Sequence, residues 1–234
     1  MITATAPAIP IVDFETVLAT TRAVRRRLDF ARPVDEQVVL ECLEIALQAP
    51  TGGNAQDWRF VLIGEAEVKR QVAMVYRDCF EEYVARPLAA AGYDAPEVRG
   101  RLDTSPAAER MLEGARYLAE NIGRAPWLVL ACATRPDPSV DRTASGTVSA
   151  VYGSIYPAVW SFCLALRSRG LGSIMTTLHL NEANRVAEIL DIPDGVTQCC
   201  LLPVAYTIGL NFKPAPRKPV GEVVFRDRWG RRDG

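Results

Sequence analysis

The ten residues from Ala49 to Trp58 (Ala-Pro-Thr-Gly-Gly-Asn-Ala-Gln-Asp-Trp) gather polar side chains and glycines between a helical pattern and an apolar run. Asn54 and Gln56 each offer hydrogen-bond donors and an acceptor, the groups that read the edge of a flat heterocycle. Gly52-Gly53 lets the backbone approach another group closely or take up a positive φ. The stretch therefore favours a ligand-binding loop, and the alternative is a polar turn between a helix and a strand.

A group of arginines upstream of this loop can bind a phosphate. The sequence has no glycine-rich phosphate loop of the Rossmann or P-loop type, so a phosphate must be held by side chains. The planar fork of arginine donates two parallel, charge-assisted hydrogen bonds to such a group. If a helix that begins after Asp13 continues through Arg22 and Arg25, their spacing places them on one face. The alternative is an exposed arginine surface over residues 22–27.

Four sequence blocks occur in an order and at spacings that resemble the nitroreductase family. The loop resembles that family's A-P-S-x-x-N-x-Q-P-W motif, and the other blocks are Arg22–Arg26, Gly170–Ser173 and Pro216–Pro219. The resemblance covers nearly the whole chain. It implies an FMN that is bound without a covalent bond, in a homodimer with the flavin at the subunit interface. It also implies that NADH or NADPH supplies electrons for nitroaromatic, quinone or similar small-molecule acceptors.

The resemblance also implies which residues contact the flavin. Arg22, Arg25 and Arg217 match ligands of the ribityl phosphate, and Arg25 or Arg26 is the candidate for a positive charge near the pyrimidine end. Thr21 and Ala23 stand where many members have Arg and Ser, and Asp57 replaces the usual Pro. The full implied cofactor site is Arg22, Ala23, Arg25, Arg26, Pro50, Thr51, Gly52, Asn54, Gln56, Ser154, Ile155, Tyr156, Pro157, Leu171, Gly172 and Arg217, with the loop residues coming from the second subunit.

The implied reaction needs no catalytic side chain, because a flavin carries its own redox chemistry. A hydride passes from the nicotinamide to flavin N5 and then to the acceptor, in alternating (ping-pong) binding steps. His179, the only histidine, is therefore predicted to be dispensable. The alternatives are another flavin reaction on the same fold, such as reductive dehalogenation or flavin fragmentation, a flavin store or sensor without turnover, and a structural dimer without flavin.

Composition favours one domain over residues 1–234. The chain is 49% apolar, enough for a full core, and its net charge of −1 does not favour a nucleic-acid surface. The six cysteines form no C-x-x-C pair and lie mostly in apolar runs, so neither a metal site nor a disulfide framework is expected. Residues 1–10 lack the charged start of a signal peptide, and we expect a reducing, cytoplasmic location.

The predicted elements form an α+β fold, with a mixed, mainly antiparallel sheet of about five strands surrounded by helices. The apolar stretch 143–169 could span a membrane, but interrupting Gly, Ser and Pro residues favour a helix buried between two subunits. Residues 86–108 are predicted to be irregular, either a lid or a surface excursion. Residues 1–11 are predicted to be a loose arm. Helices are predicted after Asp13 and Asp35 and over 65–83, 107–121, 143–169 and 181–190, and strands over 59–63, 127–133, 173–177, 198–206 and 220–225.

Overall fold

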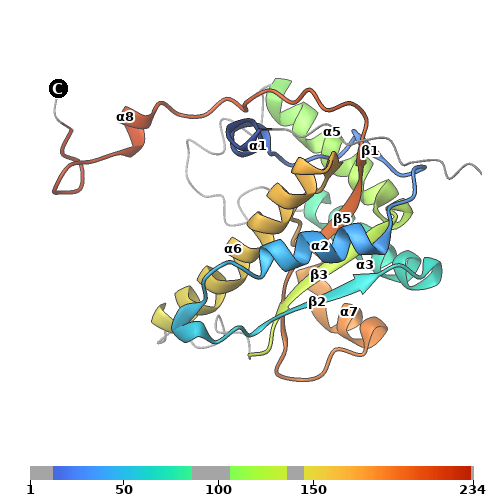
Figure 1. Ribbon diagram of the computed structural model, residues 1–234. Helices are drawn as coiled ribbons and strands as arrows, with labels where there is room; N and C mark the ends of the chain where they lie inside the picture. The colour runs from blue at the N-terminus through green and yellow to red at the C-terminus, as the bar shows by residue number, and fades with distance from the viewer. Residues whose placement is uncertain (1–12, 86–105, 136–144, 233–234) are drawn as a thin grey trace, which may run out of the picture.

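A five-stranded antiparallel sheet organises the part of the chain that the computed structural model describes, residues 13–85, 106–135 and 145–232 (Figure 1). The strand order is β1-β5-β3-β2, and β4 also pairs with β5, on the opposite side of Tyr206 from β1. Every pairing among the described strands is antiparallel. The strands are β1 (Leu28–Asp29), β2 (Trp58–Ile63), β3 (Trp127–Ala133), β4 (Leu171–Gly172) and β5 (Thr197–Thr207). The α+β fold with about five strands is thus confirmed. The predicted arm over residues 1–11 and most of the predicted irregular segment 86–108 lie outside the described residues.

The central strands are apolar because helices cover both faces of the sheet. Nine consecutive residues of β5, from Thr197 to Ala205, are buried. Alternate side chains of β3 enter different clusters: Val129 and Ala131 pack with helices α2 and α6, whereas Leu128 and Leu130 pack with α3, α5 and α7. A strand that is buried on both faces is expected to read as a continuous apolar run. This is why β3 and β5 were predicted within a residue of their observed ends.

The helices begin and end at local sequence signals. They are α1 (Phe14–Thr20), α2 (Glu36–Ala46), α3 (Ala66–Ala85), α5 (Pro106–Asn121), α6 (Ser145–Ser168), α7 (Ala183–Leu190) and α8 (Val220–Val223). The Asp13 side chain accepts a hydrogen bond from the Thr16 N–H at 2.9 Å and caps α1. Asp35 caps α2 in the same way through the Gln37 N–H. Both caps were predicted from the sequence.

Helix α1 does not continue through the arginines, so the condition under which Arg22 and Arg25 would share one helical face is not met. Thr21 has extended dihedral angles. The hydroxyls of Thr20 and Thr21 donate to the carbonyl oxygens of Thr16 and Val17, each at 2.6 Å. Such side-chain bonds to the backbone compete with further helical turns. Arg22 therefore lies beyond the end of the helix, and Arg25 lies at the bend before β1, where its carbonyl oxygen accepts from the Leu28 N–H at 3.2 Å.

Three other predicted elements differ from the structure. In the predicted strand 173–177, Thr176 alone pairs, through a single bridge to Leu201, and the paired residues Leu171–Gly172 of β4 precede that range. A 3₁₀ turn, Leu178–Glu182, precedes α7, so Asn181 does not cap that helix. Residues 220–225 form the short helix α8 instead of a strand, and this tail projects away from the sheet (Figure 1). No strand in the described residues neighbours it, and an unpaired strand is not stable alone.

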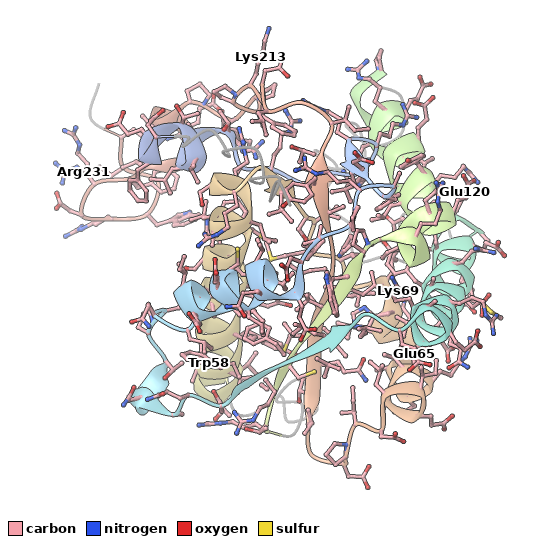
Figure 2. The ribbon with its side chains drawn as sticks, turned by 45° about the vertical axis from the view of Figure 1, so that its right-hand side comes forward. Trp58, Glu65, Lys69, Glu120, Lys213 and Arg231 are labelled. Carbon is pink, nitrogen blue, oxygen red and sulfur yellow. The ribbon has the colours of Figure 1, made fainter. Side chains whose placement is uncertain are left out.

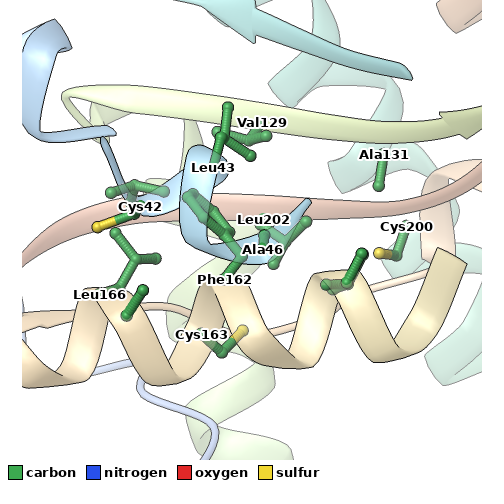
Figure 3. Packing of buried hydrophobic residues seen from close by; sticks show 14 of the residues in the cluster. Cys42, Leu43, Ala46, Val129, Ala131, Phe162, Cys163, Leu166, Cys200 and Leu202 are labelled. Atoms are coloured by element: carbon green, nitrogen blue, oxygen red, sulfur yellow. The ribbon is translucent and has the colours of Figure 1, made fainter. Parts of the chain in front are cut away.

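Helix α6 is apolar because it packs against α2 and the sheet. Its Phe162 and Leu166 are fully buried beside Leu43 and Ala46 of α2 (Figure 3). By length and composition alone, the segment Gly146–Ser168 could cross a membrane, but a buried core helix passes the same test. The packing accounts for its composition without a membrane.

Phe162→Ala is expected to lower the free energy of unfolding by about 3–5 kcal/mol, because it leaves a cavity in the larger core cluster. Urea unfolding at one fixed protein concentration measures this. The matched control is Ser149→Ala on the exposed side of α6, which should change the value by less than about 0.5 kcal/mol. Equal effects of the two substitutions would contradict the packing described for α6.

Candidate functional site

A cavity of about 190 Å³ lies where the arginine segment meets the C-terminal half of α6 and strand β4. Three arginines and no carboxylate line it. Its lining residues are Thr21, Arg22, Ala23, Val24, Arg25, Trp160, Cys163, Arg167, Leu171, Gly172, Ser173, Ile174 and Met175. We call this space the arginine cavity. The positive charge of its lining favours the binding of an anion.

The arginine segment is held in place by backbone packing against β4. The Val24 N–H donates to the carbonyl oxygen of Ser173 at 3.0 Å, and the Val24 side chain is buried. A Cβ at Gly172 would lie 2.6 Å from Cγ2 of Thr207 and 3.1 Å from Cγ2 of Val24. Glycine is therefore required at residue 172 for the two segments to approach this closely.

Arg25 and Ser173 supply donors to the cavity that have no other use in the described structure. Nε of Arg25 and Oγ of Ser173 are buried and have no hydrogen-bond partner among the described residues. Burial lowers the pKa of Arg25, although the side chain remains a cation at neutral pH. Arg22 and Ala23 are exposed at the rim. The cavity thus gathers five of the predicted site residues: Arg22, Ala23, Arg25, Leu171 and Gly172.

The predicted loop lies elsewhere, beside the first half of α6 (Figure 1). The Gly52 N–H donates to Oγ of Ser154 at 3.1 Å. Within the loop, the Gln56 N–H donates to Oγ1 of Thr51, and the Gln56 side-chain amide donates to Oδ1 of Asn54 at 3.0 Å. Asn54 and Gln56 both have positive φ, at 52° and 50°. A positive φ is uncommon in residues other than glycine and is often found at functional sites.

Most of this loop is exposed, including Pro50 and the residues from Gly52 to Gln56. Arg167, at the arginine cavity, follows Ser154 by thirteen positions along α6. At 1.5 Å per residue the two ends are about 20 Å apart. Figure 2 shows Trp58, at the end of the loop, toward the bottom of the view and Lys213 of the tail at the top. The predicted site residues therefore form two separate groups within one chain.

The predicted residues in the middle of α6 mostly serve the core. Ile155 is 1% exposed and belongs to the larger core cluster. The Tyr156 hydroxyl donates to the Cys199 carbonyl oxygen at 3.1 Å, and burial raises its pKa to about 12. Pro157 is half-buried inside the helix. Only Ser154 in this group touches the loop.

Two predicted arginines lie outside the arginine cavity. Arg26 is exposed and pairs with Glu113 of α5 at 3.0 Å. Arg217 is exposed on the tail, where its guanidinium donates to the Pro216 carbonyl oxygen at 3.0 Å. In this conformation of the tail, Arg217 lines neither of the two cavities described here.

A second, larger cavity of about 560 Å³ adjoins the first and shares Arg25, Ile174 and Met175 with it. We call it the aromatic cavity, because Tyr76, Phe80 and Tyr83 of α3 line it. The Tyr76 hydroxyl bonds Oγ1 of Thr176 at 2.7 Å. The remaining lining residues are Glu82, Met111, Leu112, Ala115, Thr177, Leu178 and Asn181.

Sequence reasoning missed the aromatic cavity and also Arg167, Ser173 and Trp160 of the arginine cavity. The one available signal was Arg167, a charge near the end of an otherwise apolar helix and three residues before Gly170.

His179 lines neither cavity, and Cys163 is the one cysteine among the lining residues, in the arginine cavity. His179 is 0% exposed, and neither ring nitrogen has a partner among the described residues. Burial lowers its pKa to about 4. All six cysteines are buried and free. No group of three or more metal-ligating side chains occurs in the described segments.

Comparison with known proteins gives a family match over most of the chain. The sequence pattern of the nitroreductase family matches residues 18–206. An iodotyrosine deiodinase from Thermotoga neapolitana is 27% identical over 209 residues, 89% of this chain and 95% of the relative. An NADH dehydrogenase from Thermus thermophilus is 40% identical over only 63 residues, 26% of this chain and 29% of the relative.

Two solved structures illustrate the likeness in fold. Oxidised iodotyrosine deiodinase bound to FMN and 3-iodo-L-tyrosine matches with a TM-score of 0.64 and 23% identity, over 92% of this chain and 98% of the other. A variant of the FMN- and NADPH-dependent nitroreductase NfnB from Sphigopyxis sp. strain HMH matches with a TM-score of 0.68 and 22% identity, over 94% and 100%. At this level of identity, both show a shared fold.

The buried His179 is expected to make stability depend on pH between about 6.5 and about 4. Its pKa is lower in the folded than in the unfolded chain, so the unfolded state binds the extra proton in this range. Its contribution is complete above pH 6.5 and falls as the pH falls, by up to about 3 kcal/mol. Urea unfolding from pH 7 to pH 4 should show a shallower pH dependence in His179→Gln than in the wild type. Identical pH dependences would contradict the assigned burial.

Proposed function

Because the chain belongs to the nitroreductase family, we propose that it is an FMN-dependent oxidoreductase. It takes electrons from NADH or NADPH and reduces nitroaromatic, quinone or similar small molecules. The single observation that carries this proposal is the arginine cavity, which collects cations without carboxylates beside two unused buried donors. A buried cation without a counter-ion is costly, and a bound phosphate removes that cost.

The residues of the arginine cavity fit the phosphate of FMN. Arg22 and Arg25 would hold it by charge-assisted hydrogen bonds, and the Ser173 hydroxyl has a donor available for the same group. When bound, FMN would accept two electrons from a nicotinamide and pass them to an acceptor. The chain itself supplies binding, orientation and a positive charge at Arg25, which lines both cavities.

The aromatic cavity is suited to a flat, apolar acceptor. Aromatic side chains favour offset stacking on other rings, and pockets for small molecules are mostly apolar with a few polar groups. The side chains of Tyr76, Phe80 and Met111 give this character, with Thr176 and Asn181 as polar groups. A single slot next to the flavin implies that nicotinamide and acceptor bind in turn.

We further propose that the protein is a homodimer, acting in the cytoplasm, whose site is completed by a second copy. One chain keeps the loop around Asn54 about 20 Å along α6 from the arginine cavity, so one chain alone does not bring both groups to one flavin. Several apolar side chains are left on the surface, including Trp160 at 39%, Met175 at 38% and Trp229 at 90% exposed. Trp160 and Met175 lie at the arginine cavity itself.

Reductive dehalogenation is the second candidate function. It is favoured by the iodotyrosine deiodinase from Thermotoga neapolitana, which is related over 89% of this chain. A halogenated phenol is also flat and largely apolar, so the aromatic cavity suits it as well.

The proposed activity is tested by an anaerobic spectrum of the flavin-loaded protein. NADH or NADPH should bleach the flavin, and a nitroaromatic or quinone should restore its colour. Release of iodide from 3-iodotyrosine at a higher kcat/KM than nitro or quinone reduction would favour dehalogenation. A flavin that neither nucleotide bleaches would instead identify a store or sensor.

His179→Ala should keep the rate of acceptor reduction within about tenfold of the wild type, because the buried imidazole ring reaches neither cavity.

Arg25→Met should weaken FMN binding by about 1.5–3 kcal/mol, the usual contribution of a hydrogen bond to a charged group. Titration of the flavin-free protein with FMN, followed by flavin fluorescence, measures the affinity. Arg26→Met is the control, because this neighbouring arginine is exposed and paired with Glu113 outside the cavity. If the two substitutions weaken FMN binding equally, the assignment of Arg25 as a ligand of the phosphate is contradicted.

A further inference from the structure

Arg167 is a buried cation in the arginine cavity that no carboxylate neutralises among the described residues. It lies in the last turn of α6, and its side chain lines the cavity together with Arg22 and Arg25. The residue is 3% exposed. Its Nε and Nη1 atoms are buried and have no hydrogen-bond partner in the described part of the chain.

The position of the Arg167 side chain is fixed by contacts with the segment that follows β5. Nη2 donates to the Leu210 carbonyl oxygen at 2.9 Å and to Oγ1 of Thr20 at 3.4 Å. The guanidinium carbon lies 4.9 Å from the centre of the Phe212 ring, which is a cation–π contact. These contacts use one nitrogen and one face of the guanidinium, so the remaining donors stay available.

A structural role at the helix end does not account for this arginine. Arginines near a helix C-terminus commonly bind the last carbonyl oxygens of their own helix. Arg169 does so through the Ala165 carbonyl oxygen at 3.3 Å, and it also pairs with Glu41 at 3.7 Å. The recorded bonds of Arg167 go to other segments instead.

The surroundings of Arg167 destabilise its protonated, charged form. Burial lowers its pKa, and the positive charge of Arg27 lowers it further. Arg27 also contacts the Phe212 ring, at 3.9 Å. A buried charge of this kind is stabilised when an anion enters its environment. An anion in the arginine cavity is the compensation that the geometry allows.

We propose that Arg167 is a third arginine that binds the phosphate of the cofactor, together with Arg22 and Arg25. This inference rests on the proposed function, because it assigns the anion as the FMN phosphate. Thr21 and Ala23 line the same cavity without adding a cation. Arg167 adds that charge from the opposite wall, on a rigid helix, where contacts with Leu210 and Phe212 already hold its side chain.

The test compares FMN with riboflavin, which has the same ring system but no phosphate. Flavin-free wild type, Arg167→Met and Arg169→Met are titrated with each ligand. Arg167→Met should lower FMN affinity at least tenfold and leave riboflavin affinity within about twofold, a change of less than about 0.5 kcal/mol. Arg169→Met should change neither. An unchanged ratio of FMN to riboflavin affinity in Arg167→Met overturns the proposal.

Arg167→Gln and inorganic phosphate test the same site if Arg167→Met does not fold or if the wild type binds no flavin. If Arg167→Met does not fold, Arg167→Gln decides by the same ratio, because its amide can still donate to the Leu210 carbonyl oxygen. If the wild type binds no flavin, the proposed function fails, and inorganic phosphate then tests the arginine site separately. Phosphate should raise the Tm of the wild type and not that of Arg167→Gln. No rise in the wild type, or equal rises in both proteins, overturns the role of Arg167.

Discussion

Arginine side chains buried without carboxylates are the constraint on which the candidate site depends. Arg25 and Arg167 approach one cavity from different segments, and each keeps buried donors without a partner in the described structure. Water is largely absent at such positions, so the fold must hold the two charges in place by other contacts. The segment that follows β5 holds Arg167 through Leu210 and Phe212, and the Val24–Ser173 backbone hydrogen bond holds the segment that carries Arg25.

The same geometry supports the proposal that a second copy of the chain completes the site. Helix α6 separates the two groups of predicted site residues, with Ser154 near its middle and Arg167 in its last turn. The loop at Ser154 is exposed, polar and held in uncommon backbone conformations. In the proposed homodimer, this exposed loop would contact the arginine cavity of the second copy.

The sequence predicted the elements that have strong periodicity or continuous apolar runs. The strands around Leu130 and Leu201 were found for this reason, and so were the helix caps at Asp13 and Asp35, whose side chains act on neighbouring residues only. The tail after Pro219 was predicted as a strand from its valines, because local composition cannot report that no neighbouring strand is present. Whether helix α1 continues through Arg22 and Arg25 was left open, because the hydroxyl bonds of Thr20 and Thr21 that end it leave no periodic signal.

The candidate site was only half predictable, for a related physical reason. Motif spacing identified Arg22, Arg25 and Gly172, which the fold brings together. The family resemblance implied Ile155 at the cofactor, but its side chain lies in the core, and the nearly all-apolar sequence of α6 gives no indication of which face is buried. Arg167 was missed because a lone charge at a helix end resembles an ordinary helix terminus. Its environment is created by tertiary contacts with Leu210 and Phe212.

Mixed dimers provide the most direct test that one flavin site is built from two copies. One variant carries Arg22→Met and Arg25→Met, and the other carries Asn54→Ala and Gln56→Ala. Each alone should bind little FMN, whereas coexpressed subunits should regain FMN binding, because a mixed dimer contains one site with an intact cavity and an intact loop. Full FMN binding by the loop variant alone, or no recovery in mixed dimers whose formation is verified, would contradict the account.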